Sequence, residues 1–376
     1  MAFHRHFVER EDFELKVVSN AQKWPEEEIG YKPVRFGVHP FTSRIFRTRL
    51  NPLLYGFHSL NSWGRLPKEA WREAVAFQPN AVFTIAGSWD YSALIARRVS
   101  LRIGVPLIAS FNDWFDYGGF LAHPIFHPII ERRFRRFYKE ADLALCTCEG
   151  MREALGPHPK SHVLYPIGAK CAQDKSEFIP YTSGDRSFVV AFAGSMGDWY
   201  GPMLESLVQA ARAQSAEVEF QFFGSNPSWS QEFDKYARTQ NIYRGHLPFE
   251  ELRKQVAGAD ALILPMGFGD NCAQVERTSF KTKFLDYLSY QKPILVWGPE
   301  YCSAARVARE FDSAEICSNP DASAILAQIQ KLSIDPQRQR ILVQNARKMY
   351  EDRFHPDKIH DGLVRAINET IQRCKT

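Results

Sequence analysis

The chain alternates between two hydrophobic periods. Short apolar runs at 81–86, 106–111, 187–193, 259–265 and 294–297 are typical of strands buried in a parallel sheet, and the run at 219–224 fits the same role. Between them, apolar residues recur at helical spacing at 68–76, 91–102, 129–140, 203–213 and 249–257. Such alternation predicts α/β architecture with parallel sheets, and 13–18 and 34–38 are further strand candidates.

One stretch, 278–299, combines a helix start, an apolar seam and a buried strand. Phe284, Leu285 and Leu288 stand at helical spacing and predict one buried face. Lys292-Pro293 ends this helix, because the residue before a proline disfavours helical backbone. The strand predicted at 294–297 then brings the chain to the carboxyl edge of the sheet, where open α/β sheets bind ligands.

Lys283 and Asp286 lie three residues apart on the same predicted helix. A carboxylate can accept two hydroxyl hydrogens and an ammonium suits a phosphate, so the pair is a candidate site for a nucleotide. Taken alone, such a pair more often lies on a solvated helix face.

Composition limits the classes of function. A chain of 376 residues exceeds what one hydrophobic core usually supports, so two domains are expected. The net charge of +4 permits an anionic small molecule or a membrane surface as partner, but the chain lacks the dense basic stripe expected for nucleic acid. Seven scattered cysteines without a Cys-x-x-Cys pair favour a reducing compartment and no structural zinc. With no apolar run near the ~18 residues of a membrane span, we predict a cytoplasmic protein with room for peripheral membrane contact.

The residues KTKFLDYLSYQKPI at 281–294 resemble the pattern Pro-Ser-Lys-x-x-Glu-Tyr-Leu-x-x-Gly-Lys-Pro-Val of GT-B glycosyltransferases, specifically the glycosyl transferases group 1 (family 4-like) kind. The run at 259–265 resembles the family's ADvfvlP segment, and 141–150 and 163–168 resemble two segments of its first domain. The resemblance implies two Rossmann-like parallel-sheet domains that face an interdomain cleft.

By resemblance, the second domain binds a nucleotide diphosphate sugar as donor substrate, and no cofactor is implied. Asp286 would hold the ribose, and Lys281, Thr282 and Lys283 would lie near the diphosphate. The turn after the strand at 187–193 would approach the phosphates, His246 the base, and the loop after 259–265 the sugar. The donor residues expected are Gly194, Ser195, Gly197, His246, Gly267, Phe268, Lys281, Thr282 and Asp286, with Lys283 and Asp113 as catalytic residues and no metal ligand.

Asp113 follows the strand at 106–111, where the family carries a polar pair beside the sugar acceptor; Asn112 replaces the family's histidine. A carboxylate there could orient or deprotonate an acceptor hydroxyl, although a turn or helix cap explains it equally well. The acceptor class stays open among a glycan, a lipid-linked molecule and a small molecule. Arg132, Arg133, Arg135 and Arg136 on the helix 129–140 offer a surface for anionic lipid, against the simpler interpretation of a solvated cationic face.

The sequence also departs from the family. It opens with the pattern of a helix end, 1–10, so either the first strand unit with its glycine loop is missing or the chain starts differently. The turn at 194–201 has neither the arginine nor the lysine common in relatives, and Thr278 stands where many retaining relatives carry a first acid; Glu276 and Asp270 are the nearby substitutes.

We therefore expect an acceptor-side domain at 1–170, a linker at 171–185, a nucleotide-sugar domain at 186–352 and a docking helix at 353–376 that returns to the first domain. The predicted enzyme is a metal-independent, retaining, hexosyltransferase-like glycosyltransferase of polysaccharide biosynthesis. The alternative from another class is a nucleotide-sugar or glycan-binding protein that has lost turnover. A GT-B epimerase is a weaker alternative, because no acid/base set stands out.

Overall fold

The computed structural model describes residues 3–19, 34–35, 48–60, 66–86, 91–116, 122–168, 178–182, 184 and 186–375. The chain divides into two compact units. Unit 1 comprises Met1–Pro166 and Asp357–Thr376, and unit 2 comprises Ile167–Pro356, so unit 2 is inserted between the two parts of unit 1. Most of the linker predicted at 171–185 lies outside the described residues.

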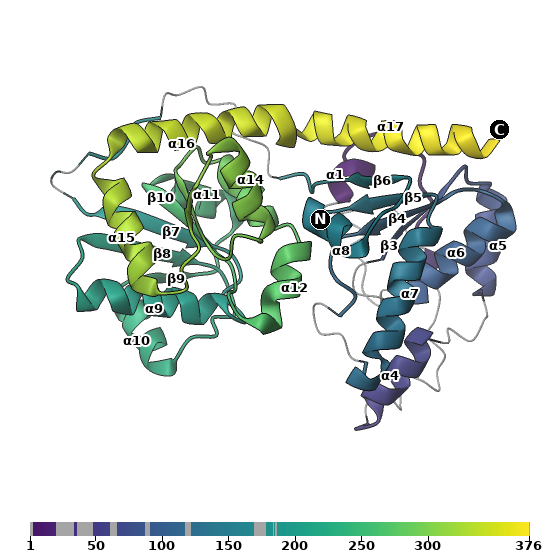
Figure 1. Ribbon diagram of the computed structural model, residues 1–376, viewed down its shortest axis with the longest axis horizontal. Coiled ribbons are helices and arrows are strands. Elements are labelled where there is room, and N and C mark those ends of the chain that lie inside the picture. Colours follow the sequence, from purple (N-terminus) through teal and green to yellow (C-terminus); the bar gives the residue numbers. More distant parts are fainter. Residues whose placement is uncertain are drawn as a thin grey trace. The chain divides into compact units, whose positions relative to one another are not determined.

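Unit 1 is built from parallel strands and the helices that connect them (Figure 1). Its elements are α1 His4–Phe7, β1 Val18–Ser19, β2 Val34–Arg35, α4 Asn51–Leu60, α5 Lys68–Phe77, β3 Val82–Ile85, α6 Tyr91–Ile103, β4 Leu107–Phe111, the 3-10 turn η1 Pro124–Phe126, α7 His127–Glu140, β5 Leu143–Cys146, α8 Glu149–Leu155, β6 Ser161–Val163 and α17 Pro356–Lys375.

The main sheet of unit 1 has the order β3-β4-β5-β6, all parallel. Its strand β4 is buried at every position, and its two faces pack on different helices. Ile108 packs with Leu363 and Ile367 of α17, whereas the ring of Phe111 lies 5.3 Å from that of Phe134 in α7. The continuous apolar run in the sequence reflects this burial on both faces.

The helix α17 confirms the amphipathic pattern of the C-terminal residues. Leu363, Ala366 and Ile367 are buried against the sheet residues Ile108, Leu143 and Leu145, and Figure 1 shows α17 running beside this sheet. The helix begins at Pro356, a few residues after the predicted start at 353. It completes the core of unit 1 from the far end of the chain.

The strand predicted at 13–18 was wrong in its extent. Only Val18–Ser19 forms β1, which pairs in parallel with β2 in a separate two-stranded sheet. Phe13 instead packs its ring against Phe7, 5.3 Å away, and against the cluster formed with α17. Packing against a segment about 350 residues away in sequence has overridden the local strand pattern.

A buried histidine pair ties the N-terminal segment to α17. His6 and His360 are 1% and 2% exposed. Their Nδ1 atoms lie 3.2 Å apart, and Nε2 of His360 lies 2.9 Å from a carboxylate oxygen of Asp12. The two Nδ1 atoms are hydrogen-bonded when one ring donates and the other ring, in its neutral form, accepts. Burial, with the nearby His360 and Arg10, lowers the pKa of His6 to about 4.

This pKa predicts a loss of stability in acid. Because the pKa of His6 in the folded protein lies below its ordinary 6.5, the stabilisation is complete above pH 6.5 and is lost as the pH falls toward 4. At ~1.4 kcal/mol per pH unit, the free energy of unfolding should drop by about 2 kcal/mol between pH 6.5 and 5. Urea unfolding of the His6→Phe variant should show a smaller drop, while His162→Gln, at an exposed position, should behave like the wild type. An equal drop in the His6→Phe variant would contradict this assignment.

Unit 2 is a second parallel α/β unit. Its elements are β7 Phe188–Ala193, α9 Tyr200–Ala213, β8 Val218–Phe223, α10 Gln231–Thr239, β9 Tyr243–Gly245, α11 Phe249–Ala257, β10 Ala261–Pro265, α12 Asp270–Thr278, α13 Thr282–Leu288, β11 Ile294–Trp297, α14 Ser303–Phe311, β12 Glu315–Cys317, α15 Ala322–Ser333, α16 Pro336–Met349 and the π-helical turn η2 Tyr350–Phe354.

The strands of unit 2 have the order β12-β11-β10-β7-β8-β9. One face of this sheet, with Phe192, Phe222 and Trp297, packs on α9 and α15. The predicted helix and strand at 278–299 are confirmed: Phe284, Leu285 and Leu288 are buried, and so is all of β11.

Two Ala-Asp pairs have the same structural role in the two units. Asp142 accepts the backbone N–H of Leu107 at 2.8 Å, and Asp260 accepts that of Val189 at 2.9 Å. Each carboxylate thus satisfies a donor at the start of a neighbouring buried strand, which explains why an acid directly precedes an apolar run.

Candidate functional site

The site candidate lies at the carboxyl edge of the unit 2 sheet. The chain builds β7, β8 and β9 toward one side, then returns to place β10 on the other side of β7. Ligands of open α/β sheets bind where the strand order reverses in this way. The turn after β7 and the loop after β10 meet at this point: a side chain built at Gly267 would come within 3.0 Å of the Trp199 ring.

The turn after β7 holds Lys283. The Nζ atom of Lys283 donates to the carbonyl oxygen of Ser195 at 3.2 Å, and it lies 4.5 Å from the ring centre of Phe192 and 4.9 Å from that of Tyr200. Gly194 leaves the space for this side chain, since a Cβ there would stand 2.0 Å from Cε of Lys283. Gly194, which was predicted to let the backbone approach a ligand, therefore makes room for the Lys283 side chain.

Backbone N–H groups of the turn are hydrogen-bonded to other residues of unit 2. The N–H of Gly194 donates to Phe223 at 2.8 Å, and that of Met196 donates to Ser225 at 3.0 Å. Ser195 is exposed, and Gly197 is partly exposed and weakly bonded to the Ser195 hydroxyl at 3.5 Å. The turn itself has no basic residue, and the ammonium of Lys283 lies against it.

The surroundings of Lys283 shift the pKa of its ammonium in opposite directions. Burial, together with the nearby ammonium of Lys281, lowers the pKa of Lys283 to about 8, and Glu276 acts in the opposite direction. Burial removes part of the water that would stabilise an ammonium. A bound anion therefore stabilises this ammonium more than it would stabilise a fully solvated one. The arrangement suits a phosphate group.

Glu276 forms a second part of the site that the sequence offered only as a substitute. It is fully buried, and its Oε1 accepts the N–H of Gly267 at 3.0 Å. Its Oε2 lies 3.5 Å from Nζ of Lys281. Burial raises the pKa of Glu276, while Lys281 opposes the rise. Among the described residues, Oε2 of Glu276 and Nε1 of Trp199 are buried polar atoms without a hydrogen-bond partner.

Thr278, which stands where many retaining relatives carry the first acid, has a structural role. Thr278 is fully buried, and its hydroxyl donates to the carbonyl of Gln274 at 2.7 Å. It therefore serves the end of α12. Asp270, the other substitute, is exposed at the start of the same helix.

The remaining donor candidates lie around this centre. Asp286 is half-buried on α13, one turn after Lys283, and Thr282 is exposed at the start of the helix. Phe268 packs its ring 6.4 Å from that of Trp297. His246 is exposed after β9, at the far edge of the sheet from β10. The contacts of Lys283 and Glu276 therefore connect five of the predicted donor-site and catalytic residues: Gly194, Ser195, Gly267, Lys281 and Lys283. Among the described residues, no contact connects His246 to this group.

Asp113 belongs to unit 1, two residues after β4. It is half-buried between the buried strand end and the buried Trp114. Nearby, the hydroxyl of Ser110 donates to the side-chain oxygen of Asn112 at 2.9 Å, which fixes the residue that replaces the family's histidine.

The four arginines of α7 do not form one free surface. Arg133 donates to the carbonyl of Leu60, and Arg135 binds Glu131 and the carbonyl of Ala154 while its guanidinium stacks on Trp114. Arg132 and Arg136 are the exposed members. None of the described helices is both long and apolar enough to cross a membrane.

No family model and no curated protein matches this chain. Solved structures do. Sucrose-phosphate synthase from Thermosynechococcus elongatus superposes with a TM-score of 0.60 at 14% identity, covering 91% of this chain and 82% of its own. HepE from Anabaena, in complex with UDP and glucose, gives 0.55 at 14% identity with 83% of each chain covered.

A lipopolysaccharide outer core galactosyltransferase, WaaB, gives a TM-score of 0.53 at 15% identity, covering 86% of this chain and 82% of its own. TarM is matched at 0.53 and 8% identity, and this chain spans 58% of its length. These likenesses concern the fold, since the identities are low. Two parallel α/β units of four and six strands, matched by such neighbours over most of the chain, show that this protein has the GT-B glycosyltransferase fold.

Proposed function

We propose that this protein transfers a sugar from a nucleotide diphosphate sugar to a hydroxyl acceptor. The observation that carries the proposal is Lys283, held by the Ser195 carbonyl at the reversal point of the unit 2 sheet, with its pKa lowered to about 8. A partly buried cation at this place matches the charge of a diphosphate leaving group. The neighbours named for a synthase and a galactosyltransferase, and HepE with UDP and glucose, support the same class.

In this proposal, Lys283 and Lys281 face the diphosphate, and Gly194, Ser195 and Gly197 line its path. As the bond between sugar and phosphate breaks, negative charge grows on the leaving diphosphate, and a fixed ammonium stabilises it. Glu276 positions Lys281 and the loop at Gly267 beside the sugar. Asp286 accepts the ribose hydroxyls, and Asp113 orients the acceptor hydroxyl.

The direct test is a panel of nucleotide sugars, with release of free nucleotide and transfer to glycan, lipid-linked and small acceptors measured separately. Turnover with at least one donor is expected, and a chelator should leave it unchanged if the reaction is metal-independent. The anomeric configuration of the product, read by NMR, tests retention. Binding without any nucleotide release would favour the alternative, a non-catalytic sugar-nucleotide binder. The observation that favours this alternative is that Thr278, a buried and neutral residue, stands where retaining relatives carry an acid.

We further propose a cytoplasmic location and a role in polysaccharide assembly, on the basis of the cysteine pattern and of the sugar chemistry. The compartment is tested by fractionating cells that express the full chain. Recovery of the protein beyond the cytoplasmic membrane would exclude this part of the proposal, whereas recovery on the cytoplasmic face of a membrane would not.

Asp286 offers a test of the ribose contact. Replacing it with asparagine removes the charge that two hydroxyls would share, and the affinity for UDP should fall about tenfold. A UDP analogue without the two ribose hydroxyls should bind the wild type and the variant equally, as measured by calorimetry. Glu250→Gln, an exposed acid of the same unit, is the matched control. Equal losses for UDP and for the analogue would assign Asp286 a structural role instead.

A further inference from the structure

Exposed apolar side chains gather at one end of unit 1. Of the thirteen large apolar side chains that the structure describes as exposed, five stand in or beside α4 and at the start of α7: Leu50, Leu53, Phe57, Ile125 and Ile129, with exposures of 58%, 37%, 55%, 67% and 46%. The two groups are neighbours, because the rings of Phe57 and Phe126 lie 5.0 Å apart and the N–H of His123 donates to the Pro52 carbonyl at 2.9 Å. Figure 1 shows α4 beside the first turns of α7, away from the sheet.

These side chains follow helical spacing on each element. Leu53 and Phe57 stand four apart on α4, and Leu50, three residues before Leu53, directly precedes this helix; Ile125 in η1 and Ile129 in α7 also stand four apart. Residues at such steps share one face. The apolar side chains are thus presented together, and the ring pair of Phe57 and Phe126 closes the gap between the two elements.

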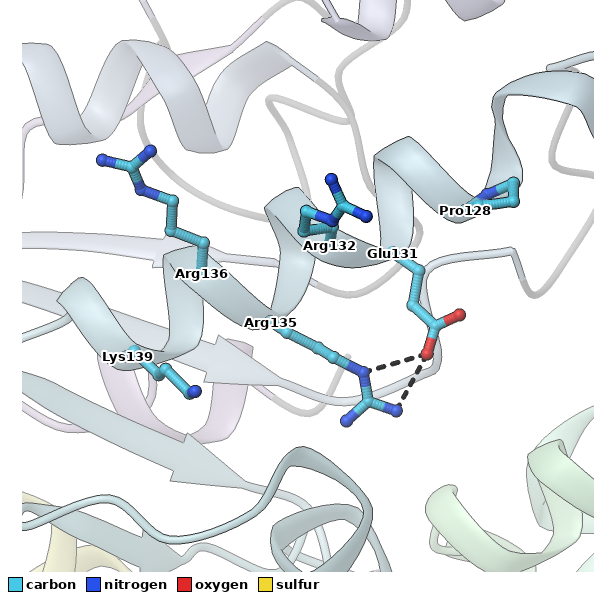
Figure 2. A pocket seen from close by; sticks show the side chains of 6 residues that line it. All are labelled: Pro128, Glu131, Arg132, Arg135, Arg136 and Lys139. Carbon is cyan, nitrogen blue, oxygen red and sulfur yellow. Dashed lines mark hydrogen bonds and ion pairs between the residues drawn. The ribbon is translucent and has the colours of Figure 1, made fainter.

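Beyond Ile129, the same face of α7 carries basic side chains. Arg132, Arg136 and Lys139 continue the spacing from Ile129, and they line an open groove with Pro128, Glu131 and Arg135. Figure 2 shows Arg132 and Arg136 extending from one side of the helix, while Glu131 and Arg135 pair with each other. Arg136 pairs with Glu140 at 2.7 Å, whereas Arg132 and Lys139 have no carboxylate partner among the described residues.

We propose that this surface, formed by Leu50, Leu53, Phe57, Ile125, Ile129, Arg132 and Lys139, binds an anionic lipid bilayer. At a rise of ~1.5 Å per residue, Arg132 lies about 5 Å and Lys139 about 15 Å along the helix from Ile129. Amphipathic elements bury their apolar side chains at the headgroup boundary and keep their cationic side chains near the lipid phosphates, and these residues offer both kinds of side chain. Long cationic side chains extend toward that layer.

A bilayer fits better than a protein partner, because the apolar end and the cationic stripe match the two layers of a lipid surface in the right order. Each cation near an anionic leaflet adds attraction that salt weakens. The inference is independent of the sugar-transfer proposal, since none of these residues belongs to the candidate donor site.

The test is flotation of the full chain with phosphatidylcholine vesicles, with and without phosphatidylglycerol. The wild type should float only with the anionic vesicles, and high salt should release it. Two double variants, Ile125→Ser with Ile129→Ser and Arg132→Glu with Lys139→Glu, should each lower the bound fraction at least about tenfold. All four positions are substantially exposed or solvated, so the fold should survive.

Matched controls are Leu101→Ser with Ile334→Ser, two apolar side chains exposed elsewhere, and Lys68→Glu with Arg72→Glu on α5. Both control pairs should float like the wild type. The proposal fails if the wild type stays with the soluble fraction, or if the test and control variants bind alike. It also fails if sedimentation velocity shows that the surface joins two copies of the chain and vesicles do not compete. UDP affinity, measured on the same variants, should be unchanged, which keeps this test separate from that of the donor site.

Discussion

Replacing Lys283 with methionine is expected to weaken the binding of a nucleoside diphosphate about a hundredfold, because a charge-assisted contact to a phosphate in a desolvated place contributes on the order of 3 kcal/mol. Methionine keeps a long side chain in the space left by Gly194 but brings no charge. Calorimetry with UDP measures the loss. Lys254→Met, at an exposed position of α11, is the control for the loss of one positive charge from the unit.

The pH dependence gives this prediction a second readout. Since the pKa of Lys283 is about 8 in the free protein, the ammonium is lost as the pH rises through 8, and the affinity of the wild type should fall above that pH. The Lys283→Met variant should show no such fall. Its resistance to urea should equal or exceed that of the wild type, because burial disfavours the ammonium that the change removes. A pH profile shared by both proteins would show that another group carries the phosphate.

Replacing Gly224 with alanine is expected to cost more than about 3 kcal/mol of the unfolding free energy. Gly224 has a φ of +146°, and a Cβ there would stand 1.8 Å from the carbonyl oxygen of Gly194. Both clashing groups are backbone, so no side-chain rotation relieves the contact. Urea unfolding measures the cost, and UDP binding should weaken with it, because the turn that holds Lys283 must shift.

Gly245 supplies the control for this prediction. Its carbonyl accepts the N–H of Gly224, and its φ is +74°, but a Cβ added there would meet no atom within 4 Å. Gly245→Ala therefore adds only the strain of left-handed backbone, about 1 kcal/mol. Similar costs at the two positions would mean that backbone strain, and not the contact with Gly194, determines the result.

Much of the fold could be predicted from the sequence, because strands buried on both faces leave continuous apolar runs. The strands β4, β7, β10 and β11 are of this kind. The helix at 282–288 was equally clear, since its apolar positions share one face. The segment at 13–18 was misjudged because its aromatic residue packs on α1 and α17, a contact that no local pattern reports.

The site was predicted less completely. Lys283 could be found from its motif, but the role of Gly194 depends on a lysine 89 positions later, which spacing does not reveal. The contacts of Glu276 with Gly267 and Lys281 do not follow from its position as a nearby substitute for the first acid. The available signal was its position on the buried side of α12, with Cys272 and Val275, where an acid needs a partner. That Trp199 and Lys281 stand beside this acid follows from the return of the chain to β10, and only the folded unit shows it.

The insertion of unit 2 between the two parts of unit 1 bears on how the protein is made. During synthesis, residues 167–356 are made before α17, so the first part of unit 1 lacks Leu363, Ala366 and Ile367 until the whole of unit 2 has been synthesised. Domains usually mature from the N-terminus onward during translation. Here the part of unit 1 that is made first cannot complete its core until α17 has been made, so it should be exposed to chaperones and proteases for longer than an uninterrupted domain would be.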